Sequence, residues 1–330
     1  MRFVQHCVAA LSLAMCVHSP GFGYEYAGCG CCNDGPEFAG GDCCDCFDPC
    51  MECCDCWDDC DRMLGFLPSD HCFDDFISPL SNPFFFEDPR SLTEARGIFI
   101  ENSLPGFIGG GDVQVFAAQV RGRVSDRWSI IAPRLGYLRD SDSDGPGGFM
   151  AAPVGVKYNF ARNVETQFLA TVGATYFIPA GSGPFFGQSD GSAHLFLTAG
   201  KEIFDYGHWL SASGFRLPLN TNWGTQFWYW SNQWDYEIAD GWYPLFGINW
   251  FHWMRSAGAA AGGAGAPVTG IDLVDVPAFG VAGTNVVTSV VGLRLKPNPN
   301  VELGTGFEFP LTQRTDILRN RLYVDAIIRY

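Results

Sequence analysis

The sequence lacks the long apolar run that a membrane-spanning helix needs. Such a helix requires about 18 or more consecutive apolar residues, and only a shorter apolar stretch occurs, near the start of the chain. Any contact with a membrane must therefore be made by β-strands. Glycine and aromatic residues are abundant, with 40 Gly and 15% aromatics among 330 residues. Both excesses are typical of a sheet-rich protein with many turns.

Cysteine is missing from the larger part of the chain, and basic residues are scarce in its front segment. The last 258 residues contain no cysteine, because all 14 cysteines lie before residue 73. Residues 24–75 contain 14 acidic residues and a single basic one, Arg62. The formal net charge of −16 therefore arises mainly in this front segment. The chain has no basic patch, so we expect no nucleic-acid partner.

The first 23 residues have the features of a secretory signal peptide. Arg2 gives a positive start, residues 7–17 form an apolar core of suitable length, and Pro20 precedes small residues. Changes in amino-acid composition then divide the remaining residues into three segments. We predict a signal peptide at 1–23, a Cys/Asp-rich segment at 24–75, a linker at 76–94 and a β-barrel at 95–330.

Apolar and polar residues alternate after the linker with the period of two that strands require. In the last segment Leu322 and Val324 alternate with Tyr323 and Asp325, and only Ile327 breaks the polar row. Most segments have the ~9–11 residues that cross a bilayer when tilted. The pattern predicts strands near 95–102, 112–124, 127–139, 149–160, 164–178, 192–203, 208–219, 225–237, 243–255, 284–295, 300–309 and 320–330.

The predicted connections alternate between short turns and long loops. The short ones are 125–126, 161–163, 205–207, 240–241 and 297–299, and the long ones include 140–148, 179–191, 256–283 and 310–319. Short turns on one side and long loops on the other are the pattern of bacterial outer-membrane barrels. We therefore predict an all-β fold: a transmembrane antiparallel up-and-down β-barrel of about 12 strands, preceded by a Cys-rich irregular segment.

A soluble β-sandwich also alternates, with its apolar rows facing inward. Three features favour the membrane barrel. The strands exceed the usual ~5–6 residues of soluble sheets. Tryptophans gather near strand ends and turns, where aromatic girdles lie; they are Trp228, Trp230, Trp234, Trp242, Trp250 and Trp253. The chain also stops on Tyr330, in phase with the apolar face.

The ending resembles the C-terminal assembly signal of Gram-negative outer-membrane proteins. Tyr330 is the final aromatic residue, and Ile328 is an apolar residue at the alternate position before it. The hairpin at residues 119–128 resembles turns of small transporter-like barrels of the phenol meta-pathway family. The aromatic stretch at 82–89 resembles exported barrels of planctomycetes. These resemblances imply the cell outer membrane, with its lipids and the barrel-assembly machinery as partners.

Twelve strands enclose more room than the eight that side chains can fill. We expect a narrow channel or transporter for small solutes, with polar side chains facing the lumen in mixed-sign ion pairs. Most of these residues would be structural and a few would tune selectivity. The lumen-facing candidates are Arg121, Arg123, Arg134, Lys157, Gln167, Glu202, Arg294, Glu302, Glu308, Arg321, Asp325 and Arg329.

An outer-membrane hydrolase is the rival from another class. It would need a Ser and a His held together by a third polar group. His194 has Ser192 nearby in sequence, but no Gly-x-Ser-x-Gly elbow is present. We therefore predict no enzymatic activity, no catalytic residues and no cofactor.

The Cys/Asp-rich segment contains a ten-residue repeat. Residues 43–50 recur as residues 53–60, with cysteines and aspartates in step. Three interpretations stay open: internal disulfides, which an exported protein favours; a soft-metal site; and cross-links to envelope proteins, which would make the barrel partly structural. Disulfides are favoured over metal, so no metal site is assigned. The disulfide candidates are Cys29, Cys31, Cys32, Cys43, Cys44, Cys46, Cys50, Cys53, Cys54, Cys56, Cys60 and Cys72.

Overall fold

The computed structural model describes residues 62–141, 147–181, 190–258, 267–274 and 277–330. Internal contacts divide the chain into Met1–Asp59 and Cys60–Tyr330. The predicted signal peptide and most of the Cys/Asp-rich segment lie outside the described residues. Of the twelve disulfide candidates, only Cys72 lies within them. The interpretations of that segment therefore stay predictions.

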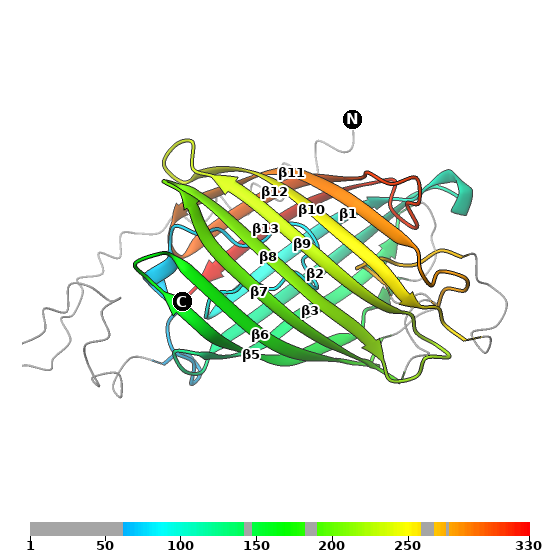
Figure 1. Cartoon of the computed structure of the whole chain (residues 1–330), viewed down its shortest axis with the longest axis horizontal. Coiled ribbons are helices and arrows are strands. Elements are labelled where there is room, and N and C mark those ends of the chain that lie inside the picture. The colour runs from blue at the N-terminus through cyan, green and yellow to red at the C-terminus, as the bar shows by residue number, and fades with distance from the viewer. Residues whose placement is uncertain (1–61, 142–146, 182–189, 259–266, 275–276) are drawn as a thin grey trace, which may run out of the picture. The chain divides into compact units, whose positions relative to one another are not determined.

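Twelve long strands form the described fold, close to the twelve that periodicity predicts (Figure 1). The strands are β1 (Glu94–Ser103), β2 (Asp112–Arg123), β3 (Trp128–Asp140), β5 (Ala152–Asn163), β6 (Phe168–Ile178), β7 (Ser192–Phe204), β8 (Gly207–Pro218), β9 (Gln226–Tyr236), β10 (Trp242–Arg255), β11 (Asn285–Asn298), β12 (Val301–Pro310) and β13 (Asn320–Arg329). A two-residue strand, β4 (Gly148–Phe149), and two short 3-10 helices, η2 (His71–Phe73) and η3 (Gly106–Ile108), complete the regular elements of the described residues.

The strands close into a single antiparallel ring. Each strand pairs with its neighbours in sequence, and β1 pairs with both β2 and β13, with Glu94 opposite Arg329. This closure removes every free sheet edge, as a membrane requires. The predicted twelve-stranded up-and-down barrel is confirmed.

One predicted strand, 149–160, is interrupted. Its two parts, β4 and β5, pair with β3 in one continuous register, since Phe149 lies opposite Tyr137 and Gly155 opposite Ile131. In this register Pro153 falls opposite Pro133. Neither proline has an N–H to donate to the ladder, so the pairing lapses between the two parts.

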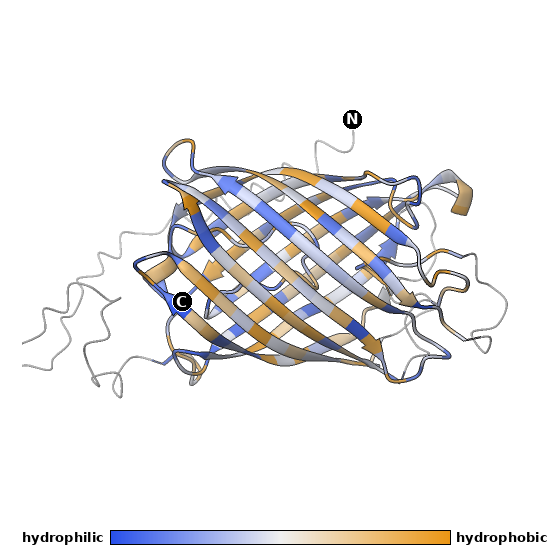
Figure 2. Cartoon of the chain, in the orientation of Figure 1, coloured by the Kyte–Doolittle hydropathy of each residue, from blue (hydrophilic) through white to orange (hydrophobic). Residues whose placement is uncertain are grey.

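Hydrophobic and hydrophilic residues alternate along the strands (Figure 2), and their exposure assigns them to an outer and an inner face of different polarity. Large apolar side chains such as Val172, Leu197 and Phe246 point outward and are exposed. Alternate residues point inward and are buried, and many are polar or charged, such as Arg294 and Gln233. This is the arrangement of a membrane barrel and the reverse of a soluble sandwich. Among the described residues, no helix has the length and apolar character to span a membrane.

One tryptophan departs from the predicted girdle. Trp230 and Trp250 point outward and lie opposite each other on β9 and β10. Trp253 is 1% exposed and packs inside the barrel against Phe227 and Phe251. The reason is its position: Trp253 is three residues after Trp250, and an odd separation along a strand reverses the face.

The two ends of the barrel differ as predicted. Short turns connect the strands at the end where β1 begins and β13 ends, while longer segments connect them at the other end (Figure 1). Some turns lie later than predicted, because β5 continues to Asn163 and β11 to Asn298. In outer-membrane barrels the short turns face the periplasm.

Candidate functional site in the barrel lumen

A non-strand segment lies inside the barrel. We call residues 67–93 the plug. It enters at the short-turn end, where the Leu67 amide donates to the Arg123 carbonyl and the Ser69 amide to the Tyr330 carbonyl. Every residue from Phe76 to Thr93 is buried. Figure 1 shows this segment running within the ring of strands. Residues 76–94, expected to be a linker, are therefore lumen filling up to Thr93, and Glu94 already belongs to β1.

Side chains of the barrel wall form hydrogen bonds with backbone groups of the plug. The plug has little regular structure, so its buried polar groups need other partners. The Ser78 and Leu80 amides donate to Glu302 Oε2 at 3.0 Å and to Gln233 Oε1 at 2.9 Å. The barrel contributes further bonds to plug carbonyls, from Gln119 to Pro83, Lys157 to Asp88, Thr171 to Pro89, Thr198 to Glu87, Tyr229 to Phe85 and Lys296 to Phe76.

Three inward glycines make room for one plug side chain. Leu80 is fully buried. A β-carbon added to Gly292, Gly304 or Gly306 would come within 2.9, 3.0 and 2.6 Å of its methyl groups. Larger residues at these wall positions would occupy the space of Leu80. The glycines therefore fix where the plug docks.

Aromatic side chains of β7 and β9 surround Phe85. The Phe85 ring lies 5.0 Å from His194, 5.3 Å from Phe227 and 5.7 Å from Tyr229, centroid to centroid. The Tyr229 hydroxyl also donates to the Phe85 carbonyl at 2.7 Å. Such edge-on ring contacts add to the burial of apolar area. The plug is thus held at Phe85 through both the side chain and the backbone of this residue.

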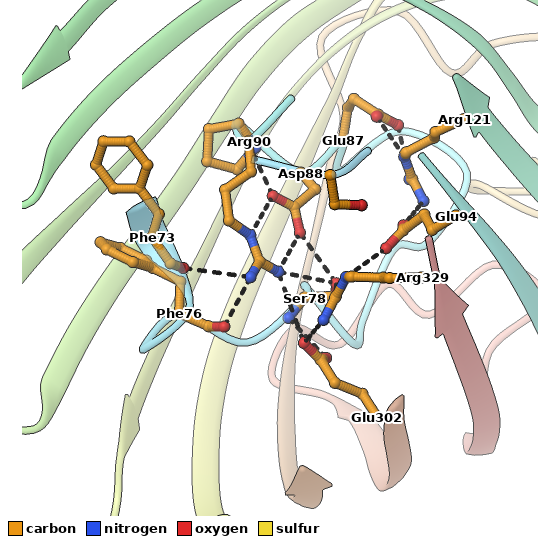
Figure 3. Close-up of polar contacts among 12 residues, drawn as sticks. Phe73, Phe76, Ser78, Glu87, Asp88, Arg90, Glu94, Arg121, Glu302 and Arg329 are labelled. Carbon is orange, nitrogen blue, oxygen red and sulfur yellow. Dashed lines mark hydrogen bonds and ion pairs between the residues drawn. The ribbon is translucent and has the colours of Figure 1, made fainter. Parts of the chain in front are cut away.

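Charged residues of the plug and the wall form one buried network (Figure 3). Arg121 donates from Nε and Nη2 to the two oxygens of Glu87 at 2.6 and 2.8 Å, and Lys157 adds a third bond at 3.0 Å. Within the plug, Arg90 binds Asp88 through two hydrogen bonds, at 3.0 and 2.8 Å. Because each charge has an opposite partner, the cost of burying it is offset.

The network keeps the plug carboxylates ionised. Burial alone raises the pKa of Glu87, but Arg121 and Lys157 outweigh it and lower the pKa to about 2. Burial likewise opposes ionisation of Asp88, and Arg90 lowers its pKa well below the ordinary value. Both groups are therefore charged at neutral pH. Removing one of these charged side chains would leave the remaining buried charges less well compensated.

A second segment reaches the lumen from the long-loop end. It belongs to the connection between β10 and β11, of which residues 256–258, 267–274 and 277–284 are described. The Asp272 carboxylate lies 2.8 Å from Arg321, and the Leu273 carbonyl accepts from Arg134 at 3.1 Å. We call residues 269–273 the loop insert. The plug and the loop insert thus occupy the barrel from opposite ends.

The structure places ten of the twelve predicted lumen residues on buried, inward positions. They are Arg121, Arg123, Arg134, Lys157, Arg294, Glu302, Glu308, Arg321, Asp325 and Arg329. The other two lie near the short-turn end. Gln167 is in the turn before β6 and donates to the Cys72 carbonyl, and Glu202 borders a small surface hollow with Asp75, Asp205 and Tyr206.

Sequence reasoning missed the partners of these residues. Glu87, Asp88 and Arg90 fall in the predicted linker, where no periodicity marks an inward face. Arg96 pairs with Asp325, and Glu94 with Arg121 and Arg329. Both fit the inward phase of β1, so the alternation rule, applied to that strand, could have found them.

The histidine of the hydrolase alternative has other partners. His194 contacts the Thr175 hydroxyl through Nδ1 at 3.3 Å and the Tyr229 hydroxyl through Nε2 at 3.0 Å. Ser192 accepts a hydrogen bond from Arg216. Both nitrogens of His194 are thus engaged with groups other than Ser192 among the described residues.

No protein-family model matches the chain, and no curated protein matches it in sequence. Solved structures do match. An outer membrane channel from Pseudomonas putida F1 has a TM-score of 0.52 at 10% identity, over 77% of this chain and 100% of its own. The NanC porin has a TM-score of 0.46 at 8% identity over 72% and 99%, and the KdgM porin 0.43 at 10% over 71% and 99%.

These likenesses concern the fold. The chain is a closed twelve-stranded antiparallel barrel, and it shares its fold with the outer membrane channel from Pseudomonas putida F1. The resemblances to the phenol meta-pathway family and to planctomycete barrels stay predictions. The fold and its apolar exterior together place the protein in the cell outer membrane.

Proposed function

We propose that this protein is a narrow channel for small solutes across the outer membrane, held closed by its plug. One observation carries the proposal: the hydrogen-bonded ring of strands is complete without the plug. The plug joins the strands only through an isolated bridge between Leu67 and Arg123, a few backbone bonds at its two ends and side-chain contacts. Displacement of the plug would therefore leave the pairing of the strands unbroken.

The inner wall supports a polar path. Twelve strands enclose a lumen wider than that of an eight-stranded barrel, which side chains fill. Here many of the inward side chains are polar or charged, and a peptide segment lies among them. Once the plug is displaced, water and small polar solutes can take its place. Wall charges would then select among these solutes.

A filled lumen also favours a second function. A barrel that never opens would serve as a structural envelope protein, linked to partners through the Cys/Asp-rich segment. The two functions differ in whether the plug can be displaced. A structural barrel gains from permanent docking, whereas a channel needs docking that can be reversed.

Planar-bilayer recordings of the full chain distinguish the two. A channel predicts discrete conductance steps with low open time, and the Leu80→Ala variant should open more often because it loses its packing against the inward glycines. Truncation of a buried leucine to alanine costs about 2–5 kcal/mol. Leu64→Ala is the matched control, since Leu64 is 92% exposed. Silence of both variants and of the wild type at all voltages would favour the structural function.

A further inference from the structure

The inward face of the strands carries more positive than negative charge. Among the buried charged residues that lie within the described strands, ten are Lys or Arg. Five are acidic, namely Glu94, Asp235, Glu302, Glu308 and Asp325. A wall with an excess of cations favours the passage of anions. The barrel therefore has the polarity of an anion path.

Carboxylates of the plug and the loop insert lie on these wall cations. Glu87 receives three hydrogen bonds from Arg121 and Lys157, and Asp272 lies against Arg321. The Arg121 bonds form the planar fork that guanidinium groups make with carboxylates. The segments that fill the lumen thus place carboxylates where an anionic solute would bind.

Arg121 and Lys157, which we call the carboxylate site, are built into the wall. They lie on β2 and β5, and their side chains are 2% and 1% exposed. Arg121 keeps a wall partner, Glu94, at 2.6 Å. Lys157 donates to Glu87 and to the Asp88 carbonyl, and both belong to the plug. Displacement of the plug removes both contacts and exposes a cationic site to the lumen.

We propose that the carboxylate site binds the carboxylate group of small organic acids, and that Glu87 fills it while the plug is docked. The inference rests on the proposed channel function and adds a ligand class to it. A solute carboxylate competes with Glu87 for the same two cations. A small organic acid therefore favours the displaced plug and then moves along a cationic wall.

Recordings of the full chain at pH 7 with acetate as the probe test this inference. At equal ionic strength, potassium acetate should lengthen the open time relative to potassium chloride. Acetamide has the same size without the charge and should have no effect. A salt gradient across the bilayer should give a reversal potential with the sign of anion selectivity.

Variants of two buried wall lysines sharpen the test. Lys157→Gln should open more often without acetate and should need about tenfold more acetate for half of its response, the loss expected for one charge-assisted hydrogen bond. Lys157→Arg should restore the response. Lys296→Gln is the matched control for the acetate response, because Lys296 is also a buried wall lysine but contacts the Phe76 carbonyl rather than a carboxylate. It should also open more often, since it loses a bond to the plug, but it should need the same acetate concentration as wild type for half of its response.

The outcomes separate this inference from the channel function. Conductance steps with cation selectivity, or with equal responses to acetate and acetamide, would overturn the carboxylate site and leave the channel standing. No steps in any variant would overturn both. Heat-modifiable gel migration reports whether each variant folds. If Lys157→Gln does not fold, the Glu87→Gln variant provides the test instead. This variant should open without acetate, and added acetate should change its open time little.

Discussion

Leu80 of the plug lies against Gly306 of β12, where a β-carbon on the glycine would be 2.6 Å from a leucine methyl carbon. Gly306 occupies an inward position between Thr305 and Phe307, both of which are exposed on the outer face. The wall thus lacks a side chain where the plug has one. This complementarity makes docking of the plug specific, and it can be tested from both sides of the contact.

The plug backbone is expected to exchange its amide hydrogens slowly. The Ser78 and Leu80 amides are buried and bonded to Glu302 and Gln233. Hydrogen–deuterium exchange of the folded protein in detergent should show residues 76–90 protected to a degree similar to β12. Residues 62–65 are exposed and serve as the internal reference. Exchange of 76–90 at the rate of that reference would show a free linker instead.

Acid is expected to release the plug. Glu87 has a pKa of about 2 when docked, against an ordinary value of 4.5. A lowered pKa means that its contribution to closure is complete above about pH 4.5 and is lost as the pH falls toward 2. Open time in planar bilayers should therefore rise on acidification below pH 4.5.

The Glu87→Gln variant isolates this effect. It should open more often at neutral pH and show a shallower rise in acid. Glu165→Gln changes an exposed carboxylate in the turn before β6 and should behave like wild type. A pH response of the same steepness in Glu87→Gln and wild type would contradict the role of Glu87.

A charged side chain on the outward face is expected to destabilise the folded barrel. Leu197 of β7 is 49% exposed and lies within the apolar band. Leu197→Arg should destabilise the folded barrel in lipid vesicles by about 2–4 kcal/mol, because arginine on the lipid face is costly near the bilayer centre. Leu219→Arg, in the loop after β8, is the control and should cost far less. Urea titration with gel-shift detection measures both, and equal costs would argue against a lipid-facing surface.

The aromatic residue after β13 is expected to support assembly. Tyr330 directly follows β13, and its backbone bonds to Ser69 and Thr93 connect it to the plug. Tyr330→Ala should lower the amount of heat-modifiable protein in the outer-membrane fraction, since the ending resembles the assembly signal. Tyr206→Ala, at an exposed turn, should leave assembly unchanged. Equal yields of heat-modifiable protein from the two variants would contradict a role of Tyr330 in assembly.

The strands were predictable because alternation is local. In β13, the inward residues Tyr323 and Asp325 alternate with Val324 and Ala326 just as the polarity pattern requires. Closure of the strands into a barrel was then predictable from their number and lengths. The break in strand 149–160 was not predicted, because it arises from two prolines, Pro133 and Pro153, that only the pairing register brings together.

The plug was not predictable in the same way. Its residues have no strand periodicity, and some of its partners lie far away along the chain, as Glu302 does from Ser78. Two signals were present in the sequence. The run Phe84–Phe85–Phe86 is too apolar for an exposed linker, and glycines such as Gly304 and Gly306 stand where the inward phase calls for polar side chains. Together these two signals indicate that a segment of the chain lies inside the barrel.

The most direct test of closure by the plug is a double-mutant cycle of open probability in planar bilayers, using Leu80→Ala, Gly306→Val and the double variant. Valine in place of Gly306 should displace Leu80 and open the channel, since overpacking costs about 1–3 kcal/mol. Gly97→Val, at an outward site with free space, is the control. The account predicts that both single variants open more often and that the double variant opens less than their sum, because the smaller alanine side chain on the plug leaves room for the valine on the wall. Strictly additive effects, or no change in conductance in any variant, would contradict it.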